Sequence, residues 1–373
     1  MSIRKISLCL LLLFLLGLAA GGVYLWSYIT REAEPVLQPL SQEFDNTSQV
    51  PDKARGLKLT PLEVTGPDGV PLSVFIAERD PDEETTRQMT VGSELAQHPA
   101  LSLHHIDYVL TAVEWDHGIR SSLPLVESLT AAGLRCVVWE PRGLDNARRY
   151  CTHGLRESRD IPLILDELES LNPGRELTVI GVGRGFGAGM LLQAACSEPR
   201  LRGLVCIDAY SSLRTSMQRL MPDTIVSQVT LALLDLRIRQ CTGIESFDVS
   251  PVDSAARLPR SVPVLIVNVE QDNPTRTLDD AVGIYKQLPG DCREVWTLRC
   301  ASDAPDAESR ELIYTRDDGR KLVRETLDVK LLPGIEQTMP AVIHWINDCM
   351  VPAIRAPQIP TPRRPHMGAG IGR

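Results

Sequence analysis

The sequence lacks several features by which specialised classes of protein are recognised. Acidic residues outnumber basic ones by 48 to 39, so the chain carries a formal net charge of −9 and lacks the positive excess that binds nucleic acid. Nine cysteines among 373 residues are too few for a disulfide scaffold, and no CxxC pair occurs, which excludes zinc-finger and thioredoxin spacings. Internal repeats and heptads are also missing. What remains is a globular composition, 43% hydrophobic and 23% charged, long enough for one large domain or two modest ones.

A long uncharged run lies near the N-terminus, over residues 6–29. As a helix it would extend roughly 36 Å, which exceeds a hydrocarbon core of about 30 Å. Arg4 and Lys5 precede it and favour a cytoplasmic N-terminus, and an aromatic cluster typical of a membrane interface closes it: Tyr24, Trp26 and Tyr28. A signal peptide cleaved near residues 18–21 is the alternative. We predict a single-pass membrane protein whose main domain is extracytoplasmic.

Composition divides the chain into four parts. Residues 1–29 form the cytoplasmic tip and transmembrane anchor, and residues 30–56 are polar and aperiodic, as expected of a stalk. Residues 57–350 form the main domain, with a helical insertion at about 211–260. Residues 351–373 are rich in proline and arginine and are expected to be a disordered tail.

Within the main domain, short apolar runs alternate with stretches of helical periodicity. The order strand, helix, strand, helix requires crossover connections and predicts an α/β fold with a doubly wound, mostly parallel sheet. A hairpin turning at residues 66–69 precedes the alternation. Strands are expected at 108–115, 135–139, 176–180, 201–207, 262–269 and 294–298, and helices at 122–132, 161–171, 186–197 and 338–349.

One glycine-rich segment carries a family resemblance. Residues 176–189 read ELTVIGVGRGFGAG, a strand followed by a tight turn and a helix. The segment resembles the nucleophile elbow, G-x-S-x-G, of the α/β-hydrolase family, in particular its lipase and serine-aminopeptidase-like branch. In that comparison Gly181 and Gly185 are the flanking glycines of the elbow, and Gly183 takes the place of the serine. The resemblance implies that the serine's hydroxyl is missing.

Further segments are similar to the same family. His117-Gly118 resembles the oxyanion loop, and Arg184 would present its backbone N–H where the family's oxyanion donor lies. Glu140-Pro141-Arg142-Gly143 resembles the D-x-R-G turn. Asp272 matches the position of the catalytic acid. Where the family places its histidine, this chain has Cys300-Ala301-Ser302-Asp303, so Asp303 stands near the position of the missing base.

The resemblance therefore implies a hydrolase architecture without a working Ser-His-Asp triad. Acyl transfer requires a nucleophile and a base that a carboxylate orients, and only the carboxylate is present. We predict a catalytically degenerate, membrane-anchored protein that binds an unidentified small molecule or protein partner. Neither a cofactor nor a metal ion is expected.

Two alternatives remain open. An active serine-type hydrolase could use a displaced nucleophile near His117, for which the candidates are Ser121, Ser122, Ser211 and Ser212. A dinucleotide-binding protein is also possible, because Gly183-x-Gly185-x-x-Ala188 satisfies the G-x-G-x-x-A fingerprint. Asp208, 20 residues beyond Ala188, would then bind the ribose.

Overall fold

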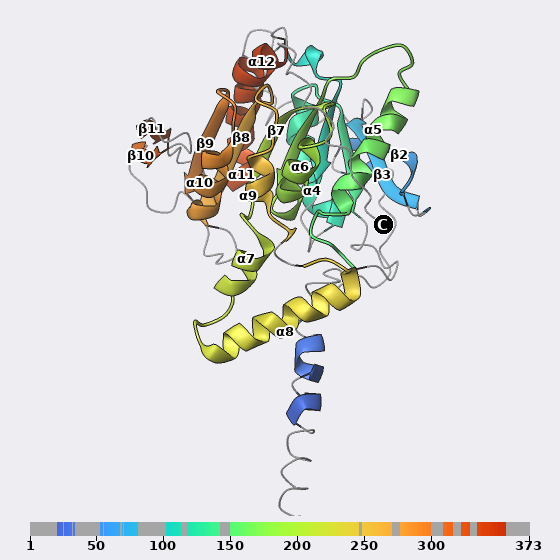
Figure 1. Cartoon of the computed structure of the whole chain (residues 1–373). Coiled ribbons are helices and arrows are strands. Elements are labelled where there is room, and N and C mark those ends of the chain that lie inside the picture. Colours follow the sequence, from blue (N-terminus) through green and yellow to red (C-terminus); the bar gives the residue numbers. More distant parts are fainter. Residues whose placement is uncertain are drawn as a thin grey trace, which may run out of the picture.

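A nine-stranded sheet forms the centre of the molecule in the computed structural model (Figure 1). The structure describes residues 21–24, 26–31, 33, 53–54, 56–67, 69, 71–80, 102–112, 118–141, 150–245, 248–270, 277–299, 309–315, 322–328 and 334–355. The strand order is β1-β2-β3-β5-β4-β6-β7-β8-β9. The strands are β1 (Lys53–Ala54), β2 (Leu57–Thr65), β3 (Pro71–Arg79), β4 (Tyr108–Ala112), β5 (Cys136–Glu140), β6 (Val179–Arg184), β7 (Leu201–Ile207), β8 (Val264–Glu270) and β9 (Arg293–Arg299).

The strand pairing changes from antiparallel to parallel once across the sheet, at β5. β1, β2 and β3 pair antiparallel, and β3 is also antiparallel to β5. From β5 to β9 every neighbouring pair is parallel. The carboxyl ends of these parallel strands therefore lie along one edge of the sheet, which is where ligand sites of open α/β sheets form.

Helices cover the sheet in two groups. On one face α4 (Gly118–Ala131) packs against α11 (Gly334–Trp345). On the other, η3 (Glu157–Arg159) joins α5 (Asp160–Ser170) to α6 (Phe186–Ala195), and α9 (Pro251–Ala255) lies between α6 and α10 (Leu278–Gln287). The other elements are η2 (Ser102–His105), the hairpin β10 (Ser309–Thr315) and β11 (Leu322–Asp328), the π-helical turn Ile346–Met350, and α12 (Val351–Arg355).

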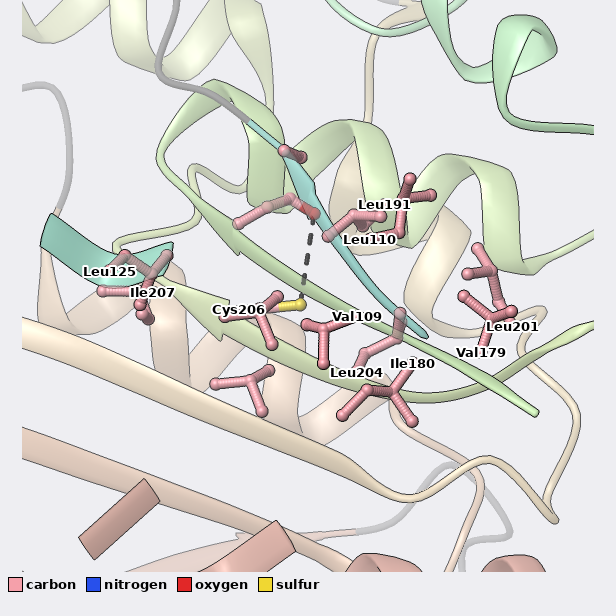
Figure 2. Close-up of a cluster of buried hydrophobic side chains, with 14 of the residues drawn as sticks. Val109, Leu110, Leu125, Val179, Ile180, Leu191, Leu201, Leu204, Cys206 and Ile207 are labelled. Carbon is pink, nitrogen blue, oxygen red and sulfur yellow. Dashed lines mark hydrogen bonds between the residues drawn. The ribbon is translucent and has the colours of Figure 1, made fainter. Parts of the chain in front are cut away.

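The apolar core lies between the parallel strands and both helix layers. The inner strands are buried on both faces, and so they read as continuous apolar runs in the sequence. Figure 2 shows this packing where β4, β6 and β7 meet α6, with Leu110, Ile180, Leu191 and Leu204 among the buried side chains. The Cys206 thiol also lies in this cluster, 4.0 Å from the carbonyl oxygen of Ala188.

A second, smaller cluster lies under the carboxyl edge of the sheet. It joins α7 (Leu213–Arg219) and α8 (Ile225–Thr242), both from the segment between β7 and β8, and includes Leu213, Met217, Leu231 and Leu234. Ala33, at the end of an N-terminal helical segment, is buried in the same cluster. The segment between β7 and β8, for which the sequence predicts a helical insertion at 211–260, contains α7, α8 and α9, and α8 extends along the side of the domain below the sheet in Figure 1.

Most predicted elements are found within a few residues of their expected bounds, and the differences have local causes. β6 begins at Val179 instead of residue 176 and continues through two glycines to Arg184, because β4 and β7 pair with it along that length. The stalk expected at 30–56 is helical at residues 30, 31 and 33 and contributes β1 to the sheet. Val351–Arg355, assigned to the tail, forms α12 with Val351 buried.

The hairpin of β10 and β11 has no counterpart in the sequence prediction. In the described part of the chain no helix is both long enough and apolar enough to cross a bilayer. Residues 1–20, which contain most of the predicted anchor, lie outside the described residues, as do residues 356–373 of the predicted tail.

Candidate functional site

The turn between β6 and α6 lies at the carboxyl edge of the sheet, and Gly185 is its central residue. Gly185 has φ 53° and ψ −113°, a conformation that costs residues with a side chain about 1–3 kcal/mol. Its N–H donates to the carbonyl oxygen of Ile207 on β7 at 2.8 Å. Its own carbonyl accepts from the N–H of Gly189 at 3.2 Å, which closes the first turn of α6. The chain thus changes from strand to helix within one residue.

The glycines on either side of this turn permit close approach of the helix to the sheet. A Cβ on Gly183 would lie 2.7 Å from the backbone nitrogen of Ala188, and a Cβ on Gly187 would lie 2.3 Å from the carbonyl oxygen of Ala112 on β4. Neither distance is compatible with a side chain. On either side of Gly185, at Gly183 and Gly187, the backbone of one element therefore lies too close to another for a side chain to fit.

The elbow lies two residues later in the chain than the sequence predicts. The resemblance places the central residue of the elbow at Gly183, between flanking Gly181 and Gly185, and this prediction is wrong: Gly183 is an interior residue of β6, in register with Ala112 and Cys206, and the positive φ lies at Gly185. Gly181 also lies within the strand, where a Cβ would meet Leu191 and Leu204. The segment GVGRGFG has a glycine at every second position, so the spacing of an elbow fits at more than one place. How far the strand pairing extends decides which glycine forms the turn.

The loop at residues 151–157 packs beside the start of α6. The imidazole of His153 meets the ring of Phe186 edge-on, with 6.1 Å between ring centroids. His153 has φ 52° and is 2% exposed, and its carbonyl oxygen accepts from the Tyr210 hydroxyl at 2.9 Å and from Nε2 of Gln193 at 3.1 Å. The position next to Gly185 is therefore occupied by buried aromatic side chains.

A buried carboxylate holds this loop in place. Glu157 is fully buried and accepts three hydrogen bonds, from the backbone N–H of Thr152 at 2.7 Å, the Thr152 hydroxyl at 2.6 Å and the N–H of Gly154 at 2.8 Å. Sequence reasoning missed both His153 and Glu157, because neither belongs to a spaced motif. In the sequence this loop is marked by Thr152 followed five residues later by Glu157, and by no recognised motif.

Arg184 and Asp208 form an ion pair beside the turn. Nε of Arg184 lies 3.7 Å from Oδ2 of Asp208, and Oδ1 of Asp208 accepts from the N–H of Val269 at 2.6 Å. Arg184 is the last residue of β6, so its N–H is not in the first turn of the helix, where an oxyanion donor is expected. Phe186 is the first residue of α6 and has that place. The Asp208 carboxylate joins β7 to β8, which does not favour a ribose-binding role.

Comparison with known proteins supports the fold and no closer relationship. No protein-family model and no curated protein sequence matches the chain. Among solved structures, it is similar to the Pyrococcus furiosus esterase Pf2001 in space groups P21 and P212121, each with 12% sequence identity and a TM-score of 0.51. The similarity covers 81% and 82% of this chain and 97% of that chain. The chain has the α/β-hydrolase fold.

In the α/β-hydrolase fold the nucleophile is carried on a strained turn between strand and helix. Gly185 has the corresponding backbone shape and carries no side chain. Two buried thiols lie near this turn, Cys151 and Cys206. Burial raises the pKa of both, and the neighbouring Glu157 raises that of Cys151 further, so both thiols stay protonated at neutral pH and are poor nucleophiles.

Three of the serines considered as displaced nucleophiles, Ser122, Ser211 and Ser212, have structural contacts. The Ser122 hydroxyl is buried in α4 and donates to the carbonyl of Ile119 at 2.7 Å. Ser212 caps α7 and accepts from the N–H of Thr215 at 3.1 Å, and Ser211 donates from its hydroxyl to the buried carboxylate of Asp280. Ser121 also lies in α4. Within the described side chains, none of the hydrogen bonds found for the hydroxyls of Ser122, Ser211 and Ser212 involves an imidazole.

Asp280 is a second buried carboxylate that sequence reasoning missed. It accepts from Ser211, from the N–H and hydroxyl of Thr277 at 2.9 and 3.1 Å, and pairs with Arg219. It thereby ties α7 to the start of α10. His117, Asp272 and Asp303 lie outside the described residues, so their predicted roles stay predictions. Gly118, also predicted for the oxyanion loop, is the first residue of α4.

Proposed function

We propose that this protein is a membrane-anchored α/β-hydrolase-fold module that has no hydrolase activity and acts by binding a ligand or protein partner. The observation that carries the proposal is Gly185. It holds the strained backbone of a nucleophile elbow, with φ 53° and ψ −113°, and has no atom that could attack a carbonyl. A glycine tolerates this conformation at little cost, so the turn can persist after the nucleophile is lost.

The sequence supports the same conclusion for the catalytic base. The chain has seven histidines, and none lies between His153 and His344. The segment after β9, where the fold places its histidine, falls in that interval. His153 lies beside the turn, but its ring packs on Phe186 in a buried site. Removing the nucleophile or the base alone costs about a million-fold in such enzymes.

The membrane anchor of the proposal rests on the uncharged run of residues 6–29. Its C-terminal part is helical in the structure, at residues 21–24 and 26–29, and exposes apolar and aromatic side chains at residues 23, 24, 26 and 28. Ile29, by contrast, is fully buried. A helix that exposes Val23, Tyr24, Trp26 and Tyr28 and buries Ile29 and Ala33 is expected where a bilayer ends and a folded domain begins.

The experiment compares the detergent-solubilised full chain with two variants, Gly185→Ser and Gly185→Ala. A fluorophosphonate probe reports activated serines, and ester hydrolysis is measured in parallel. The two variants add nearly the same strain, and only serine adds a hydroxyl. We expect no labelling of the native chain and equal, background labelling of both variants.

Two results would contradict the proposal. Labelling of the native chain that disappears on denaturation would reveal a displaced nucleophile. Labelling or turnover by Gly185→Ser above that of Gly185→Ala would reveal a base that can activate a hydroxyl at this turn.

A further inference from the structure

Exposed apolar side chains are concentrated in one part of the molecule. All but two of the large apolar side chains that the described residues expose lie on the N-terminal helix, on α8 or just before α8. The exceptions are Tyr150 and Leu171. Scattered exposed apolar side chains are ordinary on a soluble protein, but a contiguous group marks an interaction surface.

The helix α8 is apolar on two opposite sides. Its buried row, Ser227, Leu231, Leu234, Ile238 and Thr242, packs towards the domain. A second row, Ile225, Val229, Ala232 and Leu236, has the same helical spacing and is exposed. The two rows are offset by two residues, or about 200° around the helix axis, so the second row faces directly away from the domain.

The exposure along this second row is high. Ile225 is 80% exposed, Val229 50% and Leu236 45%, and Val226 beside them is 75% exposed. We call the set of Ile225, Val226, Val229, Ala232 and Leu236 the outer face of α8. A helix that needed only to cover the domain would carry polar residues at these positions.

The N-terminal helix meets α8 at its aromatic cluster. The guanidinium carbon of Arg237 lies 5.9 Å from the centre of the Trp26 ring, and Ala33 is buried with Leu231 and Leu234 of α8. Figure 1 shows the N-terminal helix leaving the molecule on the side of α8 opposite the sheet. The residues preceding it in the chain belong to the uncharged run that begins at residue 6.

From this arrangement we infer that α8 lies flat on the bilayer, with its outer face inserted among the lipids at the point where the anchor leaves the membrane. The inference rests on the anchor of the proposed function. Trp26 and Tyr28 are of the residue types that gather at the bilayer interface, and the contact of Trp26 with Arg237 of α8 sets that helix at interfacial depth. A helix in this position lies in the membrane plane with its apolar side buried a few ångströms below the headgroups.

This placement has a consequence for the candidate site. α8 lies under the carboxyl edge of the sheet, the edge that carries Gly185 and the end of β7. Seating α8 on the bilayer turns this edge of the domain towards the membrane. The partner class that the geometry favours is therefore an amphiphile or a membrane-bound protein at the same surface.

The test reconstitutes the full chain in phosphatidylcholine vesicles that contain a phospholipid with a photoactivatable diazirine in its acyl chain. Mass spectrometry then maps the labelled peptides. We expect labelling of residues 6–29 and of residues 225–236. We expect none around Leu171, which is 54% exposed but lies between α5 and β6, at the opposite edge of the sheet.

The matched variant carries Ile225→Ser, Val229→Ser and Leu236→Ser. It should lose label on α8 about tenfold or more, because each aliphatic group removed weakens burial in the bilayer, and should keep label on residues 6–29. Its melting temperature in detergent should equal that of the native chain, since the three side chains are exposed there. Leu171→Ser serves as the control and should change neither label.

The outcomes separate the two proposals. Label on residues 6–29 without label on α8 overturns the inference and leaves the anchor. Label on neither overturns the anchor, and the inference with it. Cross-links between α8 helices of two chains, with no lipid label on α8, identify a second copy as the occupant of the outer face and also overturn the inference.

Discussion

Replacing Gly187 by alanine tests the close packing of α6 against β4 that shapes the turn at Gly185. The added Cβ would lie 2.3 Å from the carbonyl oxygen of Ala112, whereas ordinary contact begins at 3.4 Å. The helix and the strand must therefore move apart by about 1.1 Å, the difference between these distances, and both are fixed by the core. We expect a cost of about 3 kcal/mol, at the upper end for overpacking of a core.

Thermal unfolding measures this cost. In a domain of this size 1 kcal/mol shifts Tm by about 2–4 °C, so Gly187→Ala should lower Tm by about 6–12 °C. Gly283→Ala is the matched control, because Gly283 lies within α10 with nothing within 4 Å of an added Cβ. Alanine there should raise stability by about 0.5–1 kcal/mol. A Gly187→Ala variant as stable as Gly283→Ala would refute the packing described for the turn.

Further predictions concern the buried polar groups and the thiols. Asp280→Asn should lower the free energy of unfolding by about 3 kcal/mol, because Arg219 loses its buried anionic partner, whereas Asp279→Asn next to it is exposed and should change it by less than about 0.5 kcal/mol. Equal urea midpoints for the two variants would contradict this role. Burial raises the pKa of Cys136 and Cys206, so neither should react with Ellman's reagent at pH 8 until the protein is denatured, and rapid native-state reaction of either would be inconsistent with the core. Burial, with the neighbouring Glu294 carboxylate, raises the pKa of Cys349 to about 11. Its alkylation rate should therefore keep rising up to about pH 11, and a plateau near pH 9 would contradict that environment.

The class of the fold and many of its elements follow from the amino-acid sequence. Strand β7 is found at the bounds that its apolar run predicts, because a strand buried on both faces needs such a run. The hairpin of β2 and β3 turns at the predicted residues, with the N–H of Gly69 donating to the carbonyl of Gly66. Gly133 follows α4 with φ 86°, as its C-cap position predicts. These features depend on interactions local in the chain or on burial averaged over a segment.

The candidate site, in contrast, depends on contacts between segments far apart in the chain. Three overlapping windows of the glycine-rich segment, 181–185, 183–187 and 185–189, fit the spacing of an elbow, and local propensity cannot choose among them. The turn forms at Gly185 because pairing with β7 keeps the chain extended as far as Arg184, which is opposite Ile207. The buried carboxylate of Asp280 is likewise defined by Ser211, a partner 69 residues away. The outer face of α8 becomes visible only once the opposite row is seen to pack on the domain, since a helix apolar on two sides has no single hydrophobic face to detect.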